Sequence, residues 1–548
     1  MKTRILSFLM LLLAAALPAS AYDFMVNGLC YNYNEDGTSV TVTSDDSYSS
    51  LSGALIIPAS VTYNGKTYSV TKIDWYAFRN CTGLTSVTFP SSINEVGGYA
   101  FDGCANLTKV NISDLTAWCN IVFHYYVSSN PLCFAHNLYL NGTKVTNLTI
   151  PNTVTKIGNY TFYSCKGLTS VTIPTSVTSI GDFSFCGCSG LTSVTIPTSV
   201  TSIGYRAFSA CSNIITVNWN ATICANFEYI YRPFYELTNI TTFNFGDSVN
   251  HIPTCLCYGL TGLTSVTIPS SVTSIGEYAF SGCSNIVTVN WNAVNCAHFT
   301  NTNKPFSGSN IKTFNFGNSV TRIPPYICYN LTGLTSVTIP NSITSIGNYA
   351  FSGCTGLTSV TIPNSVTTIG RYAFSSCFGL TSISFPNSLT TINNNAFYNC
   401  TGLTSITIPN SINRIENYAF NGCSNLMTAV SRIVTPQSVT YTYNNNQTNI
   451  FTGIPEASTL YVPKGTISNY QLEQYSEKPN PWLAFGNMCE VVDGDVNLDG
   501  SVTSADVTVV YNHLLNGDNT YIATSDIDSD GTITAADITA IYNMLLGQ

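Results

Sequence analysis

Two twelve-residue segments near the end of the chain carry the oxygen-bearing side chains that a hard metal ion needs. The first reads DVNLDGSVTSAD, residues 495–506, and the second reads DIDSDGTITAAD, residues 526–537. Alternate residues of a tight loop direct their oxygens inward, a glycine at position 6 permits the sharp bend, and a carboxylate at position 12 completes the coordination sphere. The pattern predicts two calcium sites.

The expected ligands of the two ions occupy equivalent positions in the two loops. Side chains at positions 1, 3, 5 and 12 supply carboxylate or amide oxygens, and position 7 supplies its backbone carbonyl. The first set is Asp495, Asn497, Asp499, Ser501 and Asp506, and the second set is Asp526, Asp528, Asp530, Thr532 and Asp537. Because both loops match at every ligand position, a pair of ordinary solvated turns is the weaker interpretation.

An apolar helix pattern follows each loop, and no helix pattern precedes either one. The following segments read VTVVYNHLLNG and ITAIYNMLLGQ, with apolar residues at helical spacing. An EF-hand has a helix on both sides of its loop, so the order here is different. Residues 490–548 resemble a type I-like dockerin, the calcium-dependent module by which secreted proteins bind cohesin domains of a scaffold. The resemblance implies a cohesin partner.

Matching residues on the two helices are the candidate contacts with that partner. The pairs are Tyr511 with Asn512 and Tyr542 with Asn543. Because the halves are near-copies, we expect an approximate two-fold axis and cohesin contact led by either half. Packing of both tyrosines inside the module stays open as the alternative. The helices are expected to pack antiparallel through Val510, Leu514, Ile541 and Leu545.

Acidic residues are concentrated in this C-terminal segment. Residues 490–548 contain ten Asp or Glu and no Lys or Arg, whereas the whole chain has a net charge of −9, so the remainder is close to neutral. The acidity therefore belongs mostly to the predicted metal ligands. A nucleic-acid partner is not expected, because the sequence has no basic stripe of the kind that binds phosphates.

The first 21 residues have the features of a secretory signal peptide. Lys2 and Arg4 form a positive start, residues 5–17 are an apolar run too short to span a bilayer comfortably, and residues 19–21 form a small-residue cleavage site. No other apolar stretch is long enough for a transmembrane segment. We therefore expect a secreted protein that is extracellular or associated with the cell surface.

Most of the chain repeats itself every 23 residues. Clean copies such as LTSVTIPNSVTTIGRYAFSSCFG begin at Leu334, Leu357, Leu380, Leu403 and Leu426. A fixed period of this length indicates a solenoid, in which each coil buries its apolar face on the next. L-x-x-V-x-I-P predicts a short strand, V-x-x-I-G a second extended piece, and AFSGC a corner. The pattern resembles the BspA-type leucine-rich repeat, which implies a mostly β, right-handed solenoid with the small α-helical dockerin behind it.

The chain is predicted to have five parts. These are a signal peptide at 1–21, an N-terminal cap at 22–70, the solenoid at 71–429, a C-terminal cap and linker at 430–489, and the dockerin at 490–548. In the first cap, CYNYNEDGTSVTVT predicts a hairpin around Asp36 and Gly37. Caps are expected because the end coils of a solenoid would otherwise expose apolar faces.

Twenty cysteines in an exported chain would ordinarily suggest disulfides. Ten of them instead share one repeat position, where they should form a column inside the solenoid. They are Cys81, Cys104, Cys165, Cys188, Cys211, Cys283, Cys354, Cys377, Cys400 and Cys423. Leu260 and Leu331 replace cysteine in two coils, as a packing role allows. We therefore predict buried, unpaired thiols that act as small apolar fillers.

Tryptophans in three longer segments raise the choice between core residues and sugar platforms. Trp219 and Trp291 lie 23 residues after Ile196 and Ile268, which hold inward strand positions, so both are predicted in the core. Trp118 falls outside the strand register, and the sequence leaves both interpretations open for it.

No catalytic residue is predicted. Glycoside hydrolysis needs two facing carboxylates, whereas only 18 of the 28 acidic residues precede residue 490, and these are scattered. The five histidines have no serine or cysteine partner in a recognisable motif.

Outward strand positions are mostly threonine and serine, as in Thr192, Ser193 and Thr195. Because threonine favours strands in any case, this face is either plain solvated surface or a ladder for a glycan or protein strand. We predict an exported, non-catalytic binding or adhesion protein, whose solenoid meets a glycan, matrix or cell-surface protein and whose dockerin tethers it. A component of a polysaccharide-degrading complex with hydrolase activity, and a purely structural spacer, are the alternatives.

Overall fold

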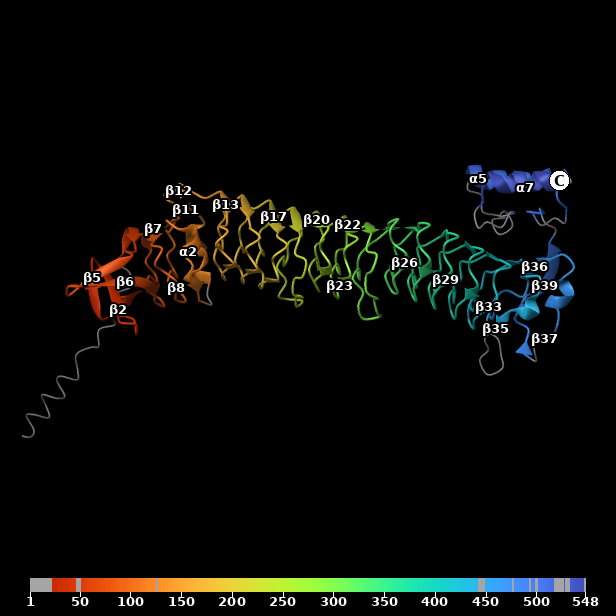
Figure 1. Cartoon of the computed structure of the whole chain (residues 1–548), viewed down its shortest axis with the longest axis horizontal. Coiled ribbons are helices and arrows are strands. Elements are labelled where there is room, and N and C mark those ends of the chain that lie inside the picture. Colours follow the sequence, from red (N-terminus) through yellow and green to blue (C-terminus); the bar gives the residue numbers. More distant parts are fainter. Residues whose placement is uncertain are drawn as a thin grey trace, which may run out of the picture. The chain divides into compact units, whose positions relative to one another are not determined.

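The computed structural model of the protein describes residues 22–45, 51–124, 127–441, 449–475, 478–491, 494–497, 501–516, 527 and 533–546. The chain divides into two compact units, each described by itself. The first contains the described residues up to Ala225 together with Ile230–Asn239. The second contains Asn226–Tyr229 and the described residues from Ile240 onward. In both, short strands from successive coils lie side by side (Figure 1).

The first unit opens with a sheet in the order β1-β2-β3-β6-β8-β10, with β5 paired to β6. Its strands are β1 (Phe24–Val26), β2 (Leu29–Tyr33), β3 (Ser39–Thr43), β5 (Ser60–Tyr63), β6 (Lys66–Ile73), β8 (Glu95–Val96) and β10 (Val122–Phe123). Strands β2 and β3 pair antiparallel across the turn at Asp36 and Gly37, which confirms the predicted hairpin. From β3 to β10 the pairing is parallel, as in the coils that follow.

A second sheet and three short ladders complete the first unit. The sheet runs β12-β11-β9-β7-β4, and the ladders are β13-β15, β14-β16-β18 and β17-β19. The strands are β4 (Ser52–Ile56), β7 (Gly83–Phe89), β9 (Lys109–Ile112), β11 (Leu138–Leu140), β12 (Thr143–Lys144), β13 (Asn147–Thr149), β14 (Lys156–Ile157), β15 (Ser170–Thr172), β16 (Ser179–Ile180), β17 (Ser193–Ile196), β18 (Ser202–Ile203) and β19 (Thr216–Trp219). Short helices α2 (Leu115–Cys119), η1 (Val127–Ser129) and α3 (Leu132–Ala135) interrupt the coils.

The second unit repeats this arrangement with two strands in most coils. The L-x-x-V-x-I strands are β20 (Thr242–Phe245), β22 (Ser265–Ile268), β24 (Thr288–Trp291), β25 (Thr313–Phe316), β27 (Ser336–Thr338), β30 (Ser382–Ser384), β32 (Ser405–Ile408), β34 (Thr428–Ser431), β36 (Thr459–Pro463) and β39 (Asn487–Val491). The V-x-x-I strands are β21 (His251–Ile252), β23 (Ser274–Ile275), β26 (Arg322–Ile323), β28 (Ser345–Ile346), β29 (Thr368–Ile369), β31 (Thr391–Ile392), β33 (Arg414–Ile415) and β35 (Thr440–Tyr441).

The remaining elements of the second unit lie near the end of the chain. They are η2 (Pro436–Ser438), α4 (Ile467–Tyr470), β37 (Gln474–Tyr475), β38 (Lys478–Pro479), η3 (Pro481–Ala484), α5 (Ser504–Asn516) and α7 (Ala535–Leu545). Parallel pairs such as Val266 with Val289 join residues 23 apart. The predicted mostly β solenoid of 23-residue coils with a small helical C-terminal region is confirmed.

A stack of phenylalanines forms the spine of the core. In the second unit Phe351, Phe374, Phe397 and Phe420 are fully buried, and successive ring centroids lie 5.2, 5.4 and 5.5 Å apart with nearly parallel planes. The rings of Phe374, Phe397 and Phe420 therefore each contact the stacked ring of the coil before and of the coil after. One repeated residue type thus couples each coil to its neighbours.

The ten cysteines of the column are buried and form no disulfide, as the sequence predicts. The structure adds a role that the small-filler interpretation lacks, because the thiols donate hydrogen bonds to the preceding coil. Cys354 Sγ lies 3.1 Å from the carbonyl of Cys328, and Cys377 Sγ lies 3.2 Å from the carbonyl of Phe351. Cysteine therefore fills the position and also satisfies a buried acceptor.

The predicted core tryptophans are confirmed by the strand register. Ile196 pairs with Trp219, Ile268 pairs with Trp291, and both indoles are completely buried. Trp118, which the sequence leaves open, is 1% exposed, and its Nε1 donates to the carbonyl of Thr161 at 3.0 Å. Because all three indoles are buried, none of them can stack on a sugar.

Candidate functional site

The predicted calcium ligands fall partly among the described residues. Asp495, Asn497, Ser501, Asp506 and Asp537 are described, whereas Asp499, Asp526, Asp528, Asp530 and Thr532 lie outside the described residues. Within the described part of the chain, no group of three or more His, Cys, Asp or Glu side chains comes together as a metal cluster. The fit to calcium is therefore judged from the surroundings of the described carboxylates.

The position-12 carboxylate of the first loop is fully buried and held on both oxygens. Asp506 Oδ1 accepts the backbone N–H groups of Val496 at 2.6 Å and Asn497 at 3.0 Å, and Oδ2 accepts that of Thr503 at 2.8 Å. These bonds join the start of the loop to the start of α5. Asp506 therefore closes the loop from the position where a ligand is expected.

The second loop repeats this geometry. Asp537 is fully buried, its Oδ1 accepts the N–H of Ile527 at 2.6 Å, and its Oδ2 accepts that of Thr534 at 2.7 Å. Thr534 and Asp537 also form a reciprocal capping box at the start of α7. The sequence signal for this box, threonine followed three residues later by an acidic residue, is present in both loops.

The charge of the segment fits a bound cation. Asp495 is 4% exposed, and Asp506 and Asp537 are not exposed at all. A buried carboxylate is unfavourable unless an opposite charge compensates it, and residues 490–548 contain no Lys or Arg. Carboxylate, amide and carbonyl oxygens are also the donors that calcium prefers. The residues present therefore fit Ca²⁺.

The two helices meet over a small apolar core. Val496, Val507, Val510 and Ile541 are buried together. The prediction that Leu514 and Leu545 also join the helices is wrong, because these side chains are 40% and 39% exposed. The buried residues of the two helices end at Val510 and Ile541, near the middle of each helix, so the leucines of the last turns are exposed to solvent.

Exposed side chains repeat at matching places on the two helices. Tyr511 is 53% exposed and Tyr542 is 50% exposed. Among their paired asparagines, Asn543 is exposed and Asn512 is half-buried. The tyrosine rings therefore lie at the surface of the module rather than in its core.

The surface of the coils is rich in hydroxyl groups, many of which bond to the preceding coil. The serine hydroxyls of Ser271, Ser342, Ser365, Ser388 and Ser411 donate to carbonyls 22 residues earlier at 2.6–2.7 Å. Threonines of the predicted ladder donate to carbonyls 23 residues earlier, as Thr404 Oγ1 does to the carbonyl of Thr381 at 3.2 Å. Part of the hydroxyl ladder is therefore structural.

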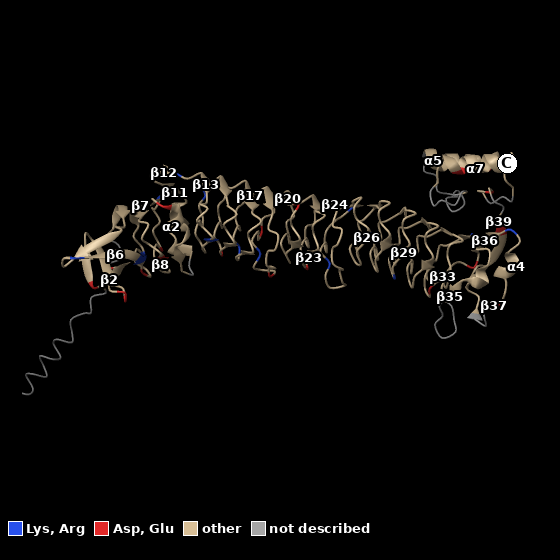
Figure 2. Cartoon of the chain, in the orientation of Figure 1, with Lys and Arg blue, Asp and Glu red and all other residues tan. Residues whose placement is uncertain are grey.

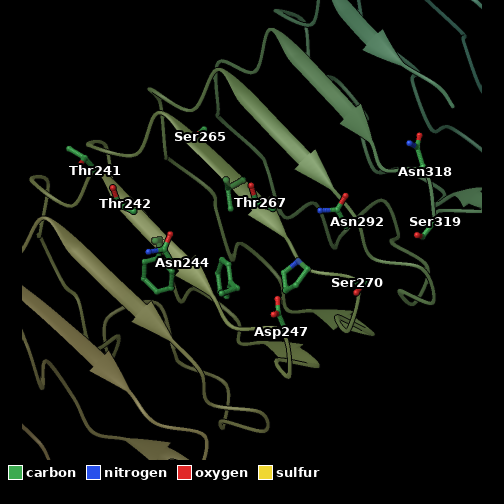
Figure 3. Close-up of a pocket in the computed structure, with 14 residues that line it drawn as sticks. Thr241, Thr242, Asn244, Asp247, Ser265, Thr267, Ser270, Asn292, Asn318 and Ser319 are labelled. Atoms are coloured by element: carbon green, nitrogen blue, oxygen red, sulfur yellow. The ribbon is translucent and has the colours of Figure 1, made fainter. Parts of the chain in front are cut away.

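A polar groove of about 470 Å³ lies in the second unit where β20 and β22 face one another. Figure 3 shows Thr242 and Asn244 of β20 opposite Ser265 and Thr267 of β22. Strand β22 heads the sheet β22-β24-β25-β27, to which β20 does not belong. Among the lining residues Asp247 carries the only charge. The groove can accept hydrogen bonds from, and donate them to, a neutral polar ligand.

Charged side chains are few along the coils, and Figure 2 shows acidic and basic groups near β2, β6 and β8. Charged residues make up 9% of the chain. Among the described residues, none of the helices has both the length and the apolar character that crossing a membrane requires.

Comparisons with known proteins agree with this architecture. The BspA type leucine rich repeat region matches residues 60–139, 132–256, 220–332, 256–354 and 321–452, and the dockerin type I domain matches residues 493–546. Dockerins of this type typically bind calcium and imply a cohesin partner. Neither match is a catalytic domain. The comparison with curated proteins gives no match.

Several solved leucine-rich repeat structures are similar to the chain. One from Bacteroides ovatus is 22% identical, with 77% of this chain and all of that chain covered and a TM-score of 0.42. A leucine rich cell surface protein from Faecalibacterium prausnitzii is 27% identical, with 80% and 99% covered and a TM-score of 0.29. The pneumococcal vaccine antigen PcpA is 16% identical, with 86% and 98% covered and a TM-score of 0.27.

The family match spans most of the coils, from residue 60 to residue 452, with the thiol and hydroxyl bonds between coils lying inside it. The chain belongs to the BspA type leucine rich repeat family and carries a C-terminal dockerin type I domain.

Proposed function

We propose that the protein is an exported, non-catalytic binding protein whose solenoid presents a ligand surface and whose dockerin attaches it to a cohesin-bearing scaffold. One observation carries the attachment. Two loop–helix units each bury a position-12 carboxylate, Asp506 and Asp537, in a segment with no Lys or Arg. The family matches and the polar surface of the coils support a binding role.

Calcium supplies the positive charge that these buried carboxylates need. In the first loop Asp495, Asn497, Asp499 and Asp506 would hold one ion with the carbonyl of Ser501. In the second loop, Asp526, Asp528, Asp530 and Asp537 would hold the other with the carbonyl of Thr532. Both oxygens of Asp506 and of Asp537 also accept backbone N–H groups, so each carboxylate joins the start of its loop to the start of its helix.

The helix surfaces support a two-fold partner contact. Tyr511, Leu514 and Leu515 follow one another at i, i+3 and i+4 on α5, so they share one face. Their side chains are 53%, 40% and 63% exposed. The equivalent residues 31 positions later, Tyr542, Leu545 and Leu546, are 50%, 39% and 69% exposed. Apolar side chains clustered at a surface are typical of docking faces.

The test is calcium-dependent capture. The full chain is immobilised and exposed to surface extract of the native organism with Ca²⁺ or with a chelator, and bound proteins are identified by mass spectrometry. We expect a cohesin-containing protein with Ca²⁺ only, and none with the double variant Asp506→Ala/Asp537→Ala. Capture of such a protein by the double variant, or equally well in chelator, would contradict the proposal.

Secretion and the absence of catalysis are parts of the same proposal. Incubation of the purified chain with plant and host glycans should leave every glycan intact. Cleavage that one carboxylate substitution abolishes would favour the alternative, a hydrolase of a polysaccharide-degrading complex. Secretion is tested by locating the protein in cell fractions, where it should be found outside the cytoplasm.

A further inference from the structure

One tryptophan differs from the other four. Trp118, Trp219, Trp291 and Trp482 are at most 1% exposed, whereas Trp75 is 42% exposed. Trp75 follows β6 at the corner of a coil, one residue before the tyrosine of the Y-A-F segment. The Trp75 indole is thus only partly covered by the protein, unlike the buried indoles, and a large aromatic ring at a surface is often a ligand contact.

A glycine in the next coil makes room for this indole. A Cβ placed on Gly98 would lie 2.5 Å from Cζ3 and 2.8 Å from Cε3 of Trp75, so the six-membered ring rests against the Gly98 backbone. Gly98 is the residue 23 positions after Trp75. Other coils have Asn159, Glu277 or Asn348 at the equivalent position. Tryptophan at position 75 is therefore matched by glycine at position 98, and contact with the Gly98 backbone restricts the position of the indole.

A hollow of about 630 Å³ lies beside this ring in the first unit. Its wall includes Asn32 of β2, Thr41 of β3 and Thr71 of β6, three neighbouring strands, together with Asn94, which directly precedes β8. Neutral amide and hydroxyl groups of this kind both donate and accept hydrogen bonds. The volume falls within the range typical of small-molecule sites.

The charged groups at the hollow are held in place by one another. Glu95 Oε2 lies 2.7 Å from Lys72 Nζ, and Glu95 Oε1 lies 2.9 Å from His124 Nε2. The hydrogen bond from Lys72 is the largest of several effects that lower the pKa of Glu95. The imidazole of His124 also lies 5.8 Å from the Trp75 ring, centroid to centroid. Such preorganised groups lose little freedom on binding a ligand.

We propose that Trp75 and the adjoining hollow bind a neutral pyranose unit of a glycan. The half-exposed indole suits the apolar C–H face of a pyranose, and the amides, hydroxyls and Lys72 suit its hydroxyl rim. This inference rests on the proposed binding function and names its ligand class.

Charge excludes two other ligand classes. Glu35, Asp36, Asp74 and Glu95 line the hollow with one lysine, so an anionic sugar is repelled. A quaternary ammonium ligand typically needs a cage of several aromatic rings, whereas the hollow is lined by only two aromatic residues, Tyr33 and Trp75, together with the cationic Lys72. A neutral polyol satisfies both donors and acceptors without a charge mismatch.

Collisional quenching of tryptophan fluorescence reports on this site, because Trp75 is the only exposed indole among the five. Acrylamide quenching of the full chain is measured with cellohexaose, maltohexaose, mannohexaose, xylohexaose, oligogalacturonate or choline, and affinities are measured by calorimetry. We expect at least one neutral oligosaccharide to protect the fluorescence. Trp75→Ala should remove most of the quenchable fluorescence and weaken that binding by about tenfold or more.

Two further variants make the result specific. Gly98→Ala keeps the indole but displaces it from the backbone of residue 98, so this variant should also weaken binding. Tyr278→Ala removes an aromatic side chain that is 44% exposed elsewhere in the chain, and it should leave binding unchanged. Protection by choline or oligogalacturonate alone, by none of the probes, or binding that survives Trp75→Ala would overturn the inference. Calcium-dependent cohesin capture should be unchanged in Trp75→Ala, so a failure here is separate from a failure of the docking proposal.

Discussion

At the scale of single residues, the cysteine column shows why cysteine, a reactive residue type, can recur in the core of the solenoid. Each thiol is small enough for the position between coils, and its S–H reaches a carbonyl of the coil before, as Cys400 does with Phe374 at 3.0 Å. Alanine would fill less space and donate nothing. Burial also raises the pKa of the Cys400 thiol well above its ordinary value, which keeps it protonated and unreactive.

The first prediction concerns Cys377. Cys377→Ala removes the sulfur and leaves the Phe351 carbonyl without this donor, so the free energy of unfolding should fall by about 1–2 kcal/mol. Urea denaturation measures the change. Cys489→Ala is the matched control, because Cys489 is exposed and its replacement should cost nothing measurable. If most of the twenty thiols of denatured, unreduced protein fail to react with a thiol reagent, disulfides exist and the column account is wrong.

The second prediction is a loss of stability in alkali. Burial raises the pKa of both Cys104 and Cys423 from 9.0 to about 12. Above pH 9 the unfolded chain therefore releases thiol protons that the folded chain keeps, and the free energy of unfolding falls as pH rises toward 12. The contribution is fully present below pH 9. Under reducing conditions, Cys104→Ala/Cys423→Ala should show a shallower decline of the urea midpoint between pH 9 and 11 than the native chain. An identical decline would contradict this linkage.

At the scale of elements, successive coils are joined by side chains as well as by strands. In the second unit, serine and threonine hydroxyls and cysteine thiols bond to carbonyls 22, 23 and 26 residues earlier. Because these bonds link neighbouring coils, stability should be distributed along the array rather than concentrated at one centre. The stability of the dockerin has a different basis, because its core has only four buried residues and its two loops are rich in carboxylates.

The third prediction follows from that difference. Removing calcium should unfold the dockerin and leave the solenoid folded, since converging carboxylates repel one another and short helices are marginal alone. Differential scanning calorimetry should show one small transition that moves with calcium and a larger one that does not. Asp506→Ala should lower calcium stoichiometry from two to one, whereas Thr508→Ala, on the exposed face of α5, should retain both ions. A single transition insensitive to chelator would refute the prediction.

The sequence predicts the parts of these elements that periodicity controls. The 23-residue register places Trp219 and Trp291 correctly, because a repeat assigns inward positions by counting. It leaves Trp118 open, since α2 and its neighbours depart from the repeat and long-range contacts with Thr161 bury the indole. Leu514 and Leu545 are misassigned because helical spacing identifies a face but not where the opposing helix ends. The Trp75–Gly98 pair is visible in the sequence only when adjacent coils are aligned and compared.

At the scale of the whole molecule, the chain combines a nearly neutral repeat array with an acidic module. Charged residues are 9% of the chain, yet the last 59 residues contain ten of its acidic residues and no Lys or Arg. We therefore expect the array to respond to alkali and the module to respond to calcium. A module that folded only with calcium would allow ligand binding and attachment to be separated experimentally.

The last prediction tests whether the module can attach in two orientations. Tyr511 and Tyr542 occupy equivalent places on α5 and α7 and are 53% and 50% exposed, so neither substitution leaves a buried cavity. If either half can lead, Tyr511→Ala or Tyr542→Ala removes one of two equivalent binding modes and should weaken binding about twofold. The double variant removes both and should weaken it by more than about thirtyfold.

Surface plasmon resonance with the captured cohesin in calcium measures these affinities, and circular dichroism confirms that each variant still folds. Thr539→Ala, an exposed change on α7, serves as the control and should bind normally. Loss of binding in one single variant alone, with calcium-dependent folding intact, would show that docking has one orientation. The two tyrosines would then be similarly exposed only because the sequence is duplicated, and only one of them would contact cohesin.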